Sequence, residues 1–414
     1  MYSLQLSSEQ LEIRDTVREF VAQEIKPVAL QAARLEMTRR PLLVDLLDKA
    51  SQMGLRTLML SEERGGAGAD TLTACLVAEE LAVGDIDLAT VLTRTSALAP
   101  LLFDQLMTDA QRERFLPAFL ADDRYHLAYA AREPGADNAI GVNYHRPVAI
   151  GSPIKTTARR DANGDWIING AKECVHNAPV AKLFAVDVKT DASKGVSTLL
   201  VPHDAPGLTV TEKAGMGTFV HGSCGDLVFT DCRVPGDNLL GAEGHSALGA
   251  FFASGRGAPQ IHALNLGVGR AAYEAALDYT QLRVQGGRRI VEHQAIGARL
   301  ADMAIKIETA RNAIWHAAWA ADHPEAVADR SLPDLPLHLV AHVFTAEAMY
   351  QVAKRAADCF GAMGVMRDMP LQKYVGDTLV FLHDGEGVDD AKLRLAEAIV
   401  GYRRTAAPAA QAAE

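Results

Sequence analysis

The stretch RVQGGRRIVEHQ, residues 283–294, lies in the C-terminal third of the chain between two long segments with helical spacing of apolar residues. It is followed by DCFGAMG at residues 358–364 and by HDGEGVDD at residues 383–390. Each motif is a weak signal alone, and we expect all three to lie on helices or helix ends. Their order, behind a β-rich middle and a helical N-terminal third, is what decides the fold.

The spacing of apolar residues changes twice along the 414-residue chain, which is longer than one hydrophobic core usually serves. Helical spacing predicts a helical N-terminal domain over residues 1–122. Short alternating runs predict a β domain over residues 123–235, and helical spacing returns over residues 236–404. Residues 405–414 mix Pro with small residues and are expected to form a flexible tail. The fold class is therefore α+β.

Local signals add detail to this outline. Ser7 or Ser8 is predicted to cap the first helix, which Pro27 is expected to stop. Another helix is predicted over residues 97–106. Asn163-Gly164 separates two strand-like runs and predicts a hairpin, because this pair tolerates the positive φ angles of a tight turn.

Composition excludes several classes of function. The formal net charge of −11 and the lack of a basic run argue against a nucleic-acid partner. No basic stretch leads into an apolar one, and no run of about 18 apolar residues predicts a membrane span, so we expect a cytoplasmic protein. The five cysteines are odd in number and form no CxxC pair, which favours reduced thiols over a disulfide framework.

Two tempting motifs have simpler explanations. GVGRAA at residues 267–272 matches a dinucleotide-binding fingerprint, but no strand precedes it, so we interpret its glycines as sites of close helix packing. His338 and His342 in HLVAH lie one helical turn apart and could bind a metal. No third ligand or general-base Glu accompanies them at the usual spacing, so we expect ordinary helix histidines and no metal.

Together with AYAAREPGADN at residues 128–138 and NGAKECVHNAPVA at residues 169–181, the three C-terminal motifs resemble the acyl-CoA dehydrogenase family of flavoproteins. The resemblance covers nearly the whole chain. It implies an N-terminal helical domain, a middle antiparallel β-barrel-like domain and a C-terminal four-helix bundle. It also implies FAD as cofactor, an acyl-CoA substrate, an electron-transfer flavoprotein as electron acceptor, and a homotetramer.

In the β domain the resemblance places Arg132, Glu133, Cys174 and His176 beside the flavin. Arg132 stands where the family usually has a hydroxyl. Cys174 and His176 replace an aromatic residue and a hydroxyl that pack beside the ring and hydrogen-bond to it. A donor to the hydride-accepting nitrogen stabilises the charge that develops on reduction, and a His can also donate. The alternative is a His in an exposed β turn away from the flavin.

In the C-terminal domain the resemblance assigns Arg283, His293 and Gln294 to the FAD pyrophosphate and adenine across a subunit boundary. An Arg suits pyrophosphate because it gives paired, charge-assisted hydrogen bonds. Gly361 and Gly364 match glycines that approach the nucleotide from the partner subunit. Both glycines could equally end a helix.

The family's catalytic base is matched by Glu386, and Asp384 is a rival because this segment is one residue longer than usual. The alternative is an acidic helix entry favoured by the helix dipole. Arg256 resembles the family Arg near the thioester arm of CoA, although its spacing differs. The helices over residues 76–101 are expected to wall the acyl slot.

Three functions remain open at this point. The first is α,β-dehydrogenation of an acyl-CoA thioester, with electrons passed to an electron-transfer flavoprotein. The second keeps the fold but uses oxygen, as a flavin-dependent monooxygenase or oxidase. The third is a non-catalytic subunit of a heteromeric dehydrogenase, which the altered cofactor motifs would explain.

Overall fold

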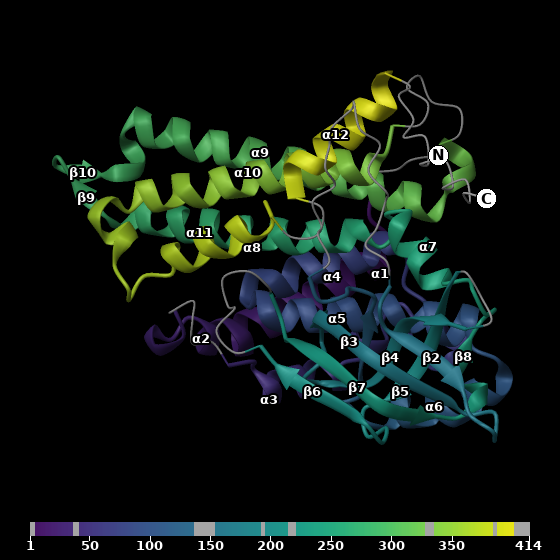
Figure 1. Ribbon diagram of the computed structural model, residues 1–414. Coiled ribbons are helices and arrows are strands. Elements are labelled where there is room, and N and C mark those ends of the chain that lie inside the picture. Colours follow the sequence, from purple (N-terminus) through teal and green to yellow (C-terminus); the bar gives the residue numbers. More distant parts are fainter. Residues whose placement is uncertain are drawn as a thin grey trace.

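A helical N-terminal region, a central sheet and a helical C-terminal region follow one another along the chain, which confirms the predicted α+β architecture (Figure 1). The two helical regions pack against each other, and the sheet lies against the N-terminal one. The predicted domain limits stay predictions, and the tail at residues 405–414 lies outside the described residues. The computed structural model describes residues 5–35, 41–135, 154–191, 195–213, 221–327, 335–383 and 387–400.

The N-terminal helices begin at side-chain caps. Ser7 and Gln10 form a reciprocal capping box at the start of α1, and Thr108 with Gln111 does the same for α6. Asp70 caps α4 and Asp85 caps α5. The helices are α1 (Ser8–Phe20), α2 (Lys26–Ala29), α3 (Val44–Gln52), α4 (Thr71–Gly84), α5 (Ile86–Ala99) and α6 (Asp109–Ala121), with π-helical segments at Val21–Ile25 and Pro100–Leu106.

Two predicted helix limits were wrong. The first helix does not stop before Pro27, because a π-helical segment, Val21–Ile25, leads directly into α2. Pro27 lies in the first turn of α2, where a helix does not need the missing N–H. The helix predicted over residues 97–106 is the end of a longer helical stretch that begins with α5 at Ile86.

Eight strands of the described chain form one sheet in the order β6-β7-β3-β2-β4-β5-β8, with β1 paired to β4. Most neighbours are antiparallel as predicted, but β1 and β2 both pair with β4 in parallel. Among the described residues no pairing joins the edge strands β6 and β8. The strands are β1 (His126–Ala130), β2 (Thr157–Arg160), β3 (Trp166–His176), β4 (Ala181–Thr190), β5 (Val196–Pro202), β6 (Leu208–Glu212), β7 (Cys224–Val234) and β8 (Leu239–Leu240).

The predicted hairpin at Asn163-Gly164 is confirmed between β2 and β3. Arg160 pairs with Trp166, and Gly164 has a φ of 87°, which a residue with a Cβ rarely adopts. Asp161 accepts hydrogen bonds from the N–H groups of Asn163 and Asp165 and so closes the turn.

The C-terminal helices pack as the predicted bundle, in which α8, α9, α10 and α11 lie side by side and α12 rests on α10 (Figure 1). Helix α11 had not been predicted as a separate element. The helices are α7 (Ala247–Ala253), α8 (Ala258–Leu282), α9 (Gln294–Asp322), α10 (Leu337–Cys359), α11 (Leu371–Val380) and α12 (Gly387–Val400); a short hairpin of β9 (Val284–Gln285) and β10 (Arg288–Arg289) joins α8 to α9. Short 3-10 helices are found at Ala32–Arg34, Leu55–Thr57, Glu62–Arg64, Gly236–Asn238, Ile290–Glu292, Pro324–Val327 and Gly361–Val365.

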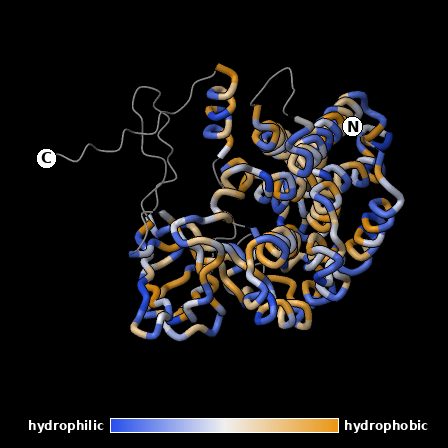
Figure 2. Tube along the Cα trace, turned by 90° about the vertical axis from the view of Figure 1, so that its right-hand side faces the viewer, coloured by the Kyte–Doolittle hydropathy of each residue, from blue (hydrophilic) through white to orange (hydrophobic). Residues whose placement is uncertain are grey.

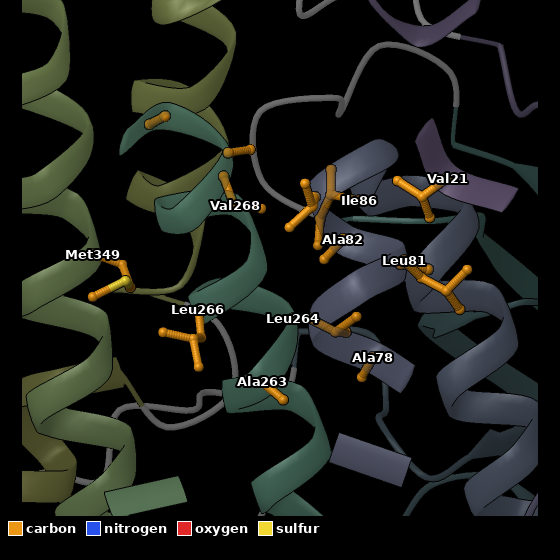
Figure 3. Packing of buried hydrophobic residues seen from close by; sticks show 14 of the residues in the cluster. Val21, Ala78, Leu81, Ala82, Ile86, Ala263, Leu264, Leu266, Val268 and Met349 are labelled. Atoms are coloured by element: carbon orange, nitrogen blue, oxygen red, sulfur yellow. The ribbon is translucent and has the colours of Figure 1, made fainter. Parts of the chain in front are cut away.

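Helix α8 is the centre of the molecule and packs between α4 and α10 (Figure 3). A Cβ at Gly267 would lie 2.3 Å from the carbonyl oxygen of Glu79, and one at Gly269 would lie 2.3 Å from the Met349 sulfur. The two glycines therefore let neighbouring helices approach α8 closely. This confirms the helix-packing interpretation of GVGRAA.

A cluster of buried charges joins four helices beside this contact. Arg270 of α8 lies 2.7 Å from the carboxylate of Glu79 and also pairs with Glu80, both on α4. Arg18 of α1 pairs with Glu80, and Arg311 of α9 pairs with Glu79. Glu79 and Glu80 are buried, so these partners compensate two carboxylates that water cannot reach.

Hydrophobic and hydrophilic residues alternate along the helices and strands rather than forming separate segments (Figure 2). Within the described chain one segment, Ile86–Leu106, is long and apolar enough to span a membrane. It consists of α5 and the π-helical segment that follows, and 78% of an apolar 18-residue stretch within it is buried inside the protein. Burial of this kind is typical of a core helix.

Candidate active site where the three regions meet

The loop after β1 is fixed to β3 by a buried ion pair. Lys172 Nζ lies 2.6 Å from the Glu133 carboxylate, and both side chains are almost fully buried. Burial lowers the pKa of Lys172 despite the hydrogen bond to Glu133. Glu133, a predicted cofactor residue, thus holds the Arg132–Gly135 loop in place. Arg132 is exposed, and its carbonyl oxygen accepts a hydrogen bond from the N–H of Glu173.

Cys174 lies in a bulge of β3, with a φ of 51°. Its N–H donates to the Asp226 carboxylate at 2.9 Å, and its sulfur lies 3.5 Å from Lys213 Nζ. Burial and the neighbouring Cys174 thiol raise the pKa of Cys224, on the adjacent strand β7, to about 12. Cys174, which was predicted to lie beside the flavin, therefore lies next to a thiol and an ammonium group.

His176 ends β3 where the sheet meets α5, and its side chain is half-buried. Asn177, the next residue, is buried, and its side-chain NH2 donates to the carbonyl oxygens of Val91 and Leu127. Asn177 has a φ of 65°, which turns the chain sharply after His176. The Asn177 amide therefore fixes the end of β3 against α5 and β1.

His221 connects the sheet to α11 and was not predicted as a site residue. His176 pairs with Cys224, and the N–H of Asn177 donates to the Ser223 carbonyl oxygen at 2.6 Å. His221 precedes Cys224 by three residues in the sequence. The centroid of its ring is 4.9 Å from that of Phe381. No sequence signal marks this contact, because it joins residues of two domains.

Phe381 follows α11 and leads into the predicted catalytic segment. Asp384 and Glu386 themselves lie outside the described residues. Both ends of their loop are described, and they meet: the Val388 N–H donates to the Leu382 carbonyl oxygen at 3.1 Å. The structure therefore brings the base of the acidic loop close to the end of β3 that carries His176.

The remaining predicted cofactor residues lie at the end of the bundle remote from the sheet (Figure 1). Arg283 is exposed at the start of the β9–β10 hairpin, and Gln294 is exposed at the start of α9. His293 Nε2 lies 3.1 Å from the Gln285 carbonyl oxygen, and its Nδ1 lies 3.3 Å from an Arg288 nitrogen. His293 thus stabilises the hairpin from which Arg283 and Gln294 project.

Gly361 and Gly364 follow α10 at the same end of the bundle. Gly361 has a φ of 57° and open space where a Cβ would point. A Cβ at Gly364 would lie 2.3 Å from the Ala357 carbonyl oxygen, so Gly364 is required for packing on the last turn of α10. The ring of Phe360, the residue before Gly361, stacks on the ring of Tyr279 in α8, and the two ring centroids are 4.0 Å apart.

The predicted cofactor residues thus form two separate groups. One group comprises Arg132, Cys174 and His176, near the base of the acidic loop. Glu133 belongs to the same group and stabilises the Arg132–Gly135 loop through its ion pair with Lys172. The other comprises Arg283, Gln294 and Gly361 at the far end of the bundle. Helix α8, which leads into the β9–β10 hairpin, is roughly 37 Å long at a rise of 1.5 Å per residue. Within one protomer the structure does not bring the two groups together.

Arg256 lies between α7 and α8, is exposed, and has its guanidinium 5.6 Å from the Phe251 ring centroid. The His338 ring fills the position that a Cβ at Gly255 would take, so Gly255 is required there. The His342 ring lies 5.0 Å from the buried ring of His262. In the described part of the chain, no group of three His, Cys, Asp or Glu side chains is arranged to hold a metal ion.

The helices predicted to wall the acyl slot enclose a cavity of about 10 Å³ between α4, α5 and α8. That volume holds at most about one water molecule. Among the residues that line it are Leu81, Leu92, Thr93, Ser96 and Gln260.

Comparisons with known proteins match this architecture domain by domain. The profiles of the acyl-CoA dehydrogenase N-terminal, middle and C-terminal domains match residues 7–123, 151–232 and 243–397. Isobutyryl-CoA dehydrogenase of Dictyostelium discoideum is 29% identical over 91% of this chain and 86% of its own length.

Solved structures give the same result. Butyryl-CoA dehydrogenase from Megasphaera elsdenii superimposes with a TM-score of 0.81 at 25% identity, over 96% of this chain and all of its own. A glutaryl-CoA dehydrogenase from Mycobacterium smegmatis in complex with FADH2 shares the fold, with a TM-score of 0.77 at 22% identity over 97% and 96% of the two chains.

Fold and site together define a three-domain flavoenzyme architecture, in which two helical domains pack against each other and a sheet lies against the N-terminal one. The chain belongs to the acyl-CoA dehydrogenase family. It is an oxidoreductase of the class that acts on CH–CH donors, and FAD is the cofactor of the family.

Proposed function

We propose that this protein binds FAD and dehydrogenates an acyl-CoA thioester between its α and β carbons. The observation that carries the proposal is the contact of His221 with Phe381, because it brings the end of β3 to the base of the loop with Asp384 and Glu386. The relatives are named as dehydrogenases of isobutyryl-, butyryl- and glutaryl-CoA, and these names support an acyl-CoA substrate.

The side chains at the two groups of predicted cofactor residues fit FAD. Arg283 offers a planar pair of donors suited to pyrophosphate oxygens, and the open space at Gly361 lets the backbone approach a nucleotide. His176 offers a ring N–H at the end of β3, where the resemblance places the flavin.

In the proposed reaction the Glu386 carboxylate removes a proton from the α carbon, with Asp384 as the rival base. FAD, when bound, supplies the acceptor for the hydride that leaves the β carbon. The buried Phe381 side chain helps to exclude water, which would strengthen electrostatic interactions with the thioester. The His176 N–H would stabilise negative charge on the reduced cofactor.

We also propose a homo-oligomer, a tetramer by analogy with the family, in which Arg283, Gln294 and Gly361 of one protomer complete the site of another. The separation of the two groups of residues supports this. So do the large apolar side chains exposed near that end of the bundle: Leu282 is 80% and Val365 70% exposed.

Leu282→Lys should therefore weaken assembly and lower FAD retention together, since a charge at a buried interface is costly. The oligomeric state from sedimentation and the flavin-to-protein ratio measure the two effects. Val44→Lys, on the exposed surface of α3, is the matched control and should change neither. A monomer that retains FAD fully would contradict a shared site.

The proposed reaction is tested by anaerobic titration with a panel of straight, branched and dicarboxylic acyl-CoAs. We expect the oxidised flavin absorbance to bleach with one or more of them, and an electron-transfer flavoprotein to restore it. Rapid oxygen consumption by the reduced protein would instead favour the oxidase or monooxygenase function, which the replacements at Arg132, Cys174 and His176 suggest. A colourless protein that cannot be reconstituted would favour a non-catalytic subunit.

A further inference from the structure

We propose that Cys174 and Cys224 form a redox-active dithiol, which a hydroperoxide converts into a disulfide between β3 and β7. All five cysteines of the chain are free thiols in the structure, so the state described is the reduced one. The inference goes beyond the proposed reaction and stands on contacts between described residues. Only the expected effect on activity rests on the proposed function.

Strand pairing brings the two cysteines to one face of the sheet. His176 of β3 pairs with Cys224 of β7, and the register shifts just before this pair, between Lys172 and Val175. Cys174 lies in that bulge. Residues two positions apart on a strand share a face, so Cys174 is a diagonal neighbour of Cys224. The two thiols are within hydrogen-bonding reach of each other.

Lys213, which follows β6, gives Cys174 a charged neighbour. Its Nζ lies 3.5 Å from the Cys174 sulfur, 2.8 Å from the Glu173 carboxylate and 3.2 Å from that of Asp226. The hydrogen bond to Glu173 is the main cause that raises the pKa of Lys213, so its side chain is an ammonium group at neutral pH. An ammonium group beside a sulfur favours the thiolate, which is the form that reacts with oxidants.

The two cysteines differ in a way that sets the order of the reaction. Cys174 is half-buried and Cys224 is buried, so an oxidant in solution reaches Cys174 first. Burial is the main cause that raises the pKa of Cys224 to about 12, and this keeps Cys224 in its thiol form at neutral pH. Cys174 is therefore the residue that attacks the oxidant, and Cys224 is the residue that closes the disulfide.

The reaction balances with the hydroperoxide as the only co-reactant. The Cys174 thiolate attacks the outer peroxide oxygen, and the O–O bond breaks. A sulfenic acid forms on Cys174, and the leaving oxygen takes up the proton that the thiol had released. The Cys224 sulfur then attacks the Cys174 sulfur, and the S–S bond forms as the S–O bond breaks. The hydroxide leaves with the Cys224 proton as water, so the two thiols are oxidised and the peroxide is reduced.

A disulfide at this place would disturb residues that we propose to contact the flavin. The bond would draw the Cys174 sulfur away from Lys213 and fix the bulge to β7. The neighbouring Glu173 holds the loop after β1: its N–H donates to the Arg132 carbonyl oxygen, and its carboxylate accepts from the Gly135 N–H at 3.3 Å. A shift of the bulge would therefore reach this loop, and misplacement by about 1 Å can cost about 10²-fold in rate.

The test treats the FAD-loaded protein with hydrogen peroxide, blocks the remaining thiols and maps the peptides by mass spectrometry without a reductant. We expect a peptide pair linked through Cys174 and Cys224, which dithiothreitol separates. Cys224→Ser should stop at a sulfenic acid on Cys174 that dimedone traps, and Cys174→Ser should give neither product. Cys232→Ser removes another buried thiol of β7 and is the matched control, so it should form the linked pair as the parent does.

Lys213→Gln should slow formation of the linked pair by about 3–10-fold, because the thiolate loses its neighbouring ammonium group. The oxidised parent should lose at least about 10-fold in kcat and recover with dithiothreitol.

If the linked pair forms in a protein that oxidises no acyl-CoA, the proposed reaction is wrong and the dithiol stands. Oxidation that stops at Cys174 in the parent, or a disulfide to any other cysteine, would overturn the proposal. An equal rate in Lys213→Gln would contradict the role of Lys213, and full activity of the linked protein would contradict the effect on the flavin side.

Discussion

Glu386→Gln is expected to lower kcat by about 10²–10⁴-fold, the range typical for loss of a positioned general base. Gln has nearly the shape of Glu but cannot accept the α proton, so acyl-CoA binding should be retained. The measurement is single-turnover flavin reduction together with exchange of the substrate α hydrogen in D2O, and both should be lost. The acyl-CoA Kd of the oxidised protein should stay close to that of the parent.

Asp384→Asn is the matched control for this experiment, because both acids lie in the loop whose ends meet at Leu382 and Val388. It should retain most of the activity. The opposite pattern, with activity lost in Asp384→Asn and kept in Glu386→Gln, would make Asp384 the base. The loop's one extra residue relative to the family pattern is the physical reason for testing both.

Arg270→Met is expected to destabilise the fold by about 3–5 kcal/mol, the usual cost of removing one partner from a buried ion pair. Arg270 is 13% exposed and pairs with both Glu79 and Glu80, so the variant leaves two buried carboxylates undercompensated. Chemical denaturation measures the free energy of unfolding. Arg18→Met removes the 51% exposed partner of the same Glu80 and should cost no more than about 1 kcal/mol.

The effect of Arg270→Met should depend on pH in a defined direction. Burial alone would raise the pKa of Glu80, but hydrogen bonds from Arg270 and Arg18 outweigh it and lower that pKa. The stabilisation is therefore fully present above the unfolded pKa of about 4.5 and is lost as pH falls through the lower folded pKa. The difference in the free energy of unfolding between the parent protein and Arg270→Met should be largest near neutral pH and should become smaller in acid. A difference that stays constant down to pH 3 would argue against the ion pair as its cause.

Local sequence signals predicted the elements that depend on neighbouring residues. The capping residue Ser7 and the Asn163-Gly164 turn are confirmed, because each acts within a few residues of itself. The glycines of GVGRAA were correctly interpreted from their helical spacing. Pro27 was misread as a stop, since a π-helical segment before it changes the hydrogen-bonding register. Helix α11 was missed because its apolar pattern is brief.

The candidate site was predictable only in part. Motif order led to the family, and the structure places His176 at the end of β3, while its position beside the flavin stays a prediction. The role of Glu133 as a cofactor residue stays a prediction, and no sequence signal indicated its ion pair with Lys172. His221 gave no signal at all, because a single His before Gly-Ser is unremarkable until the residues it contacts are known.

The sequence by itself determined most of the segments that are helices and strands, the order of the three domains and the family, because periodicity, caps and turns act over short distances along the chain. Only the tertiary structure decided which side chains meet. His221 and the Asp377 carbonyl oxygen are 156 residues apart, and Lys172 and Glu133 are 39 apart. Such contacts depend on strand register and helix packing, and a shift of one residue in a strand would turn every side chain to the opposite face.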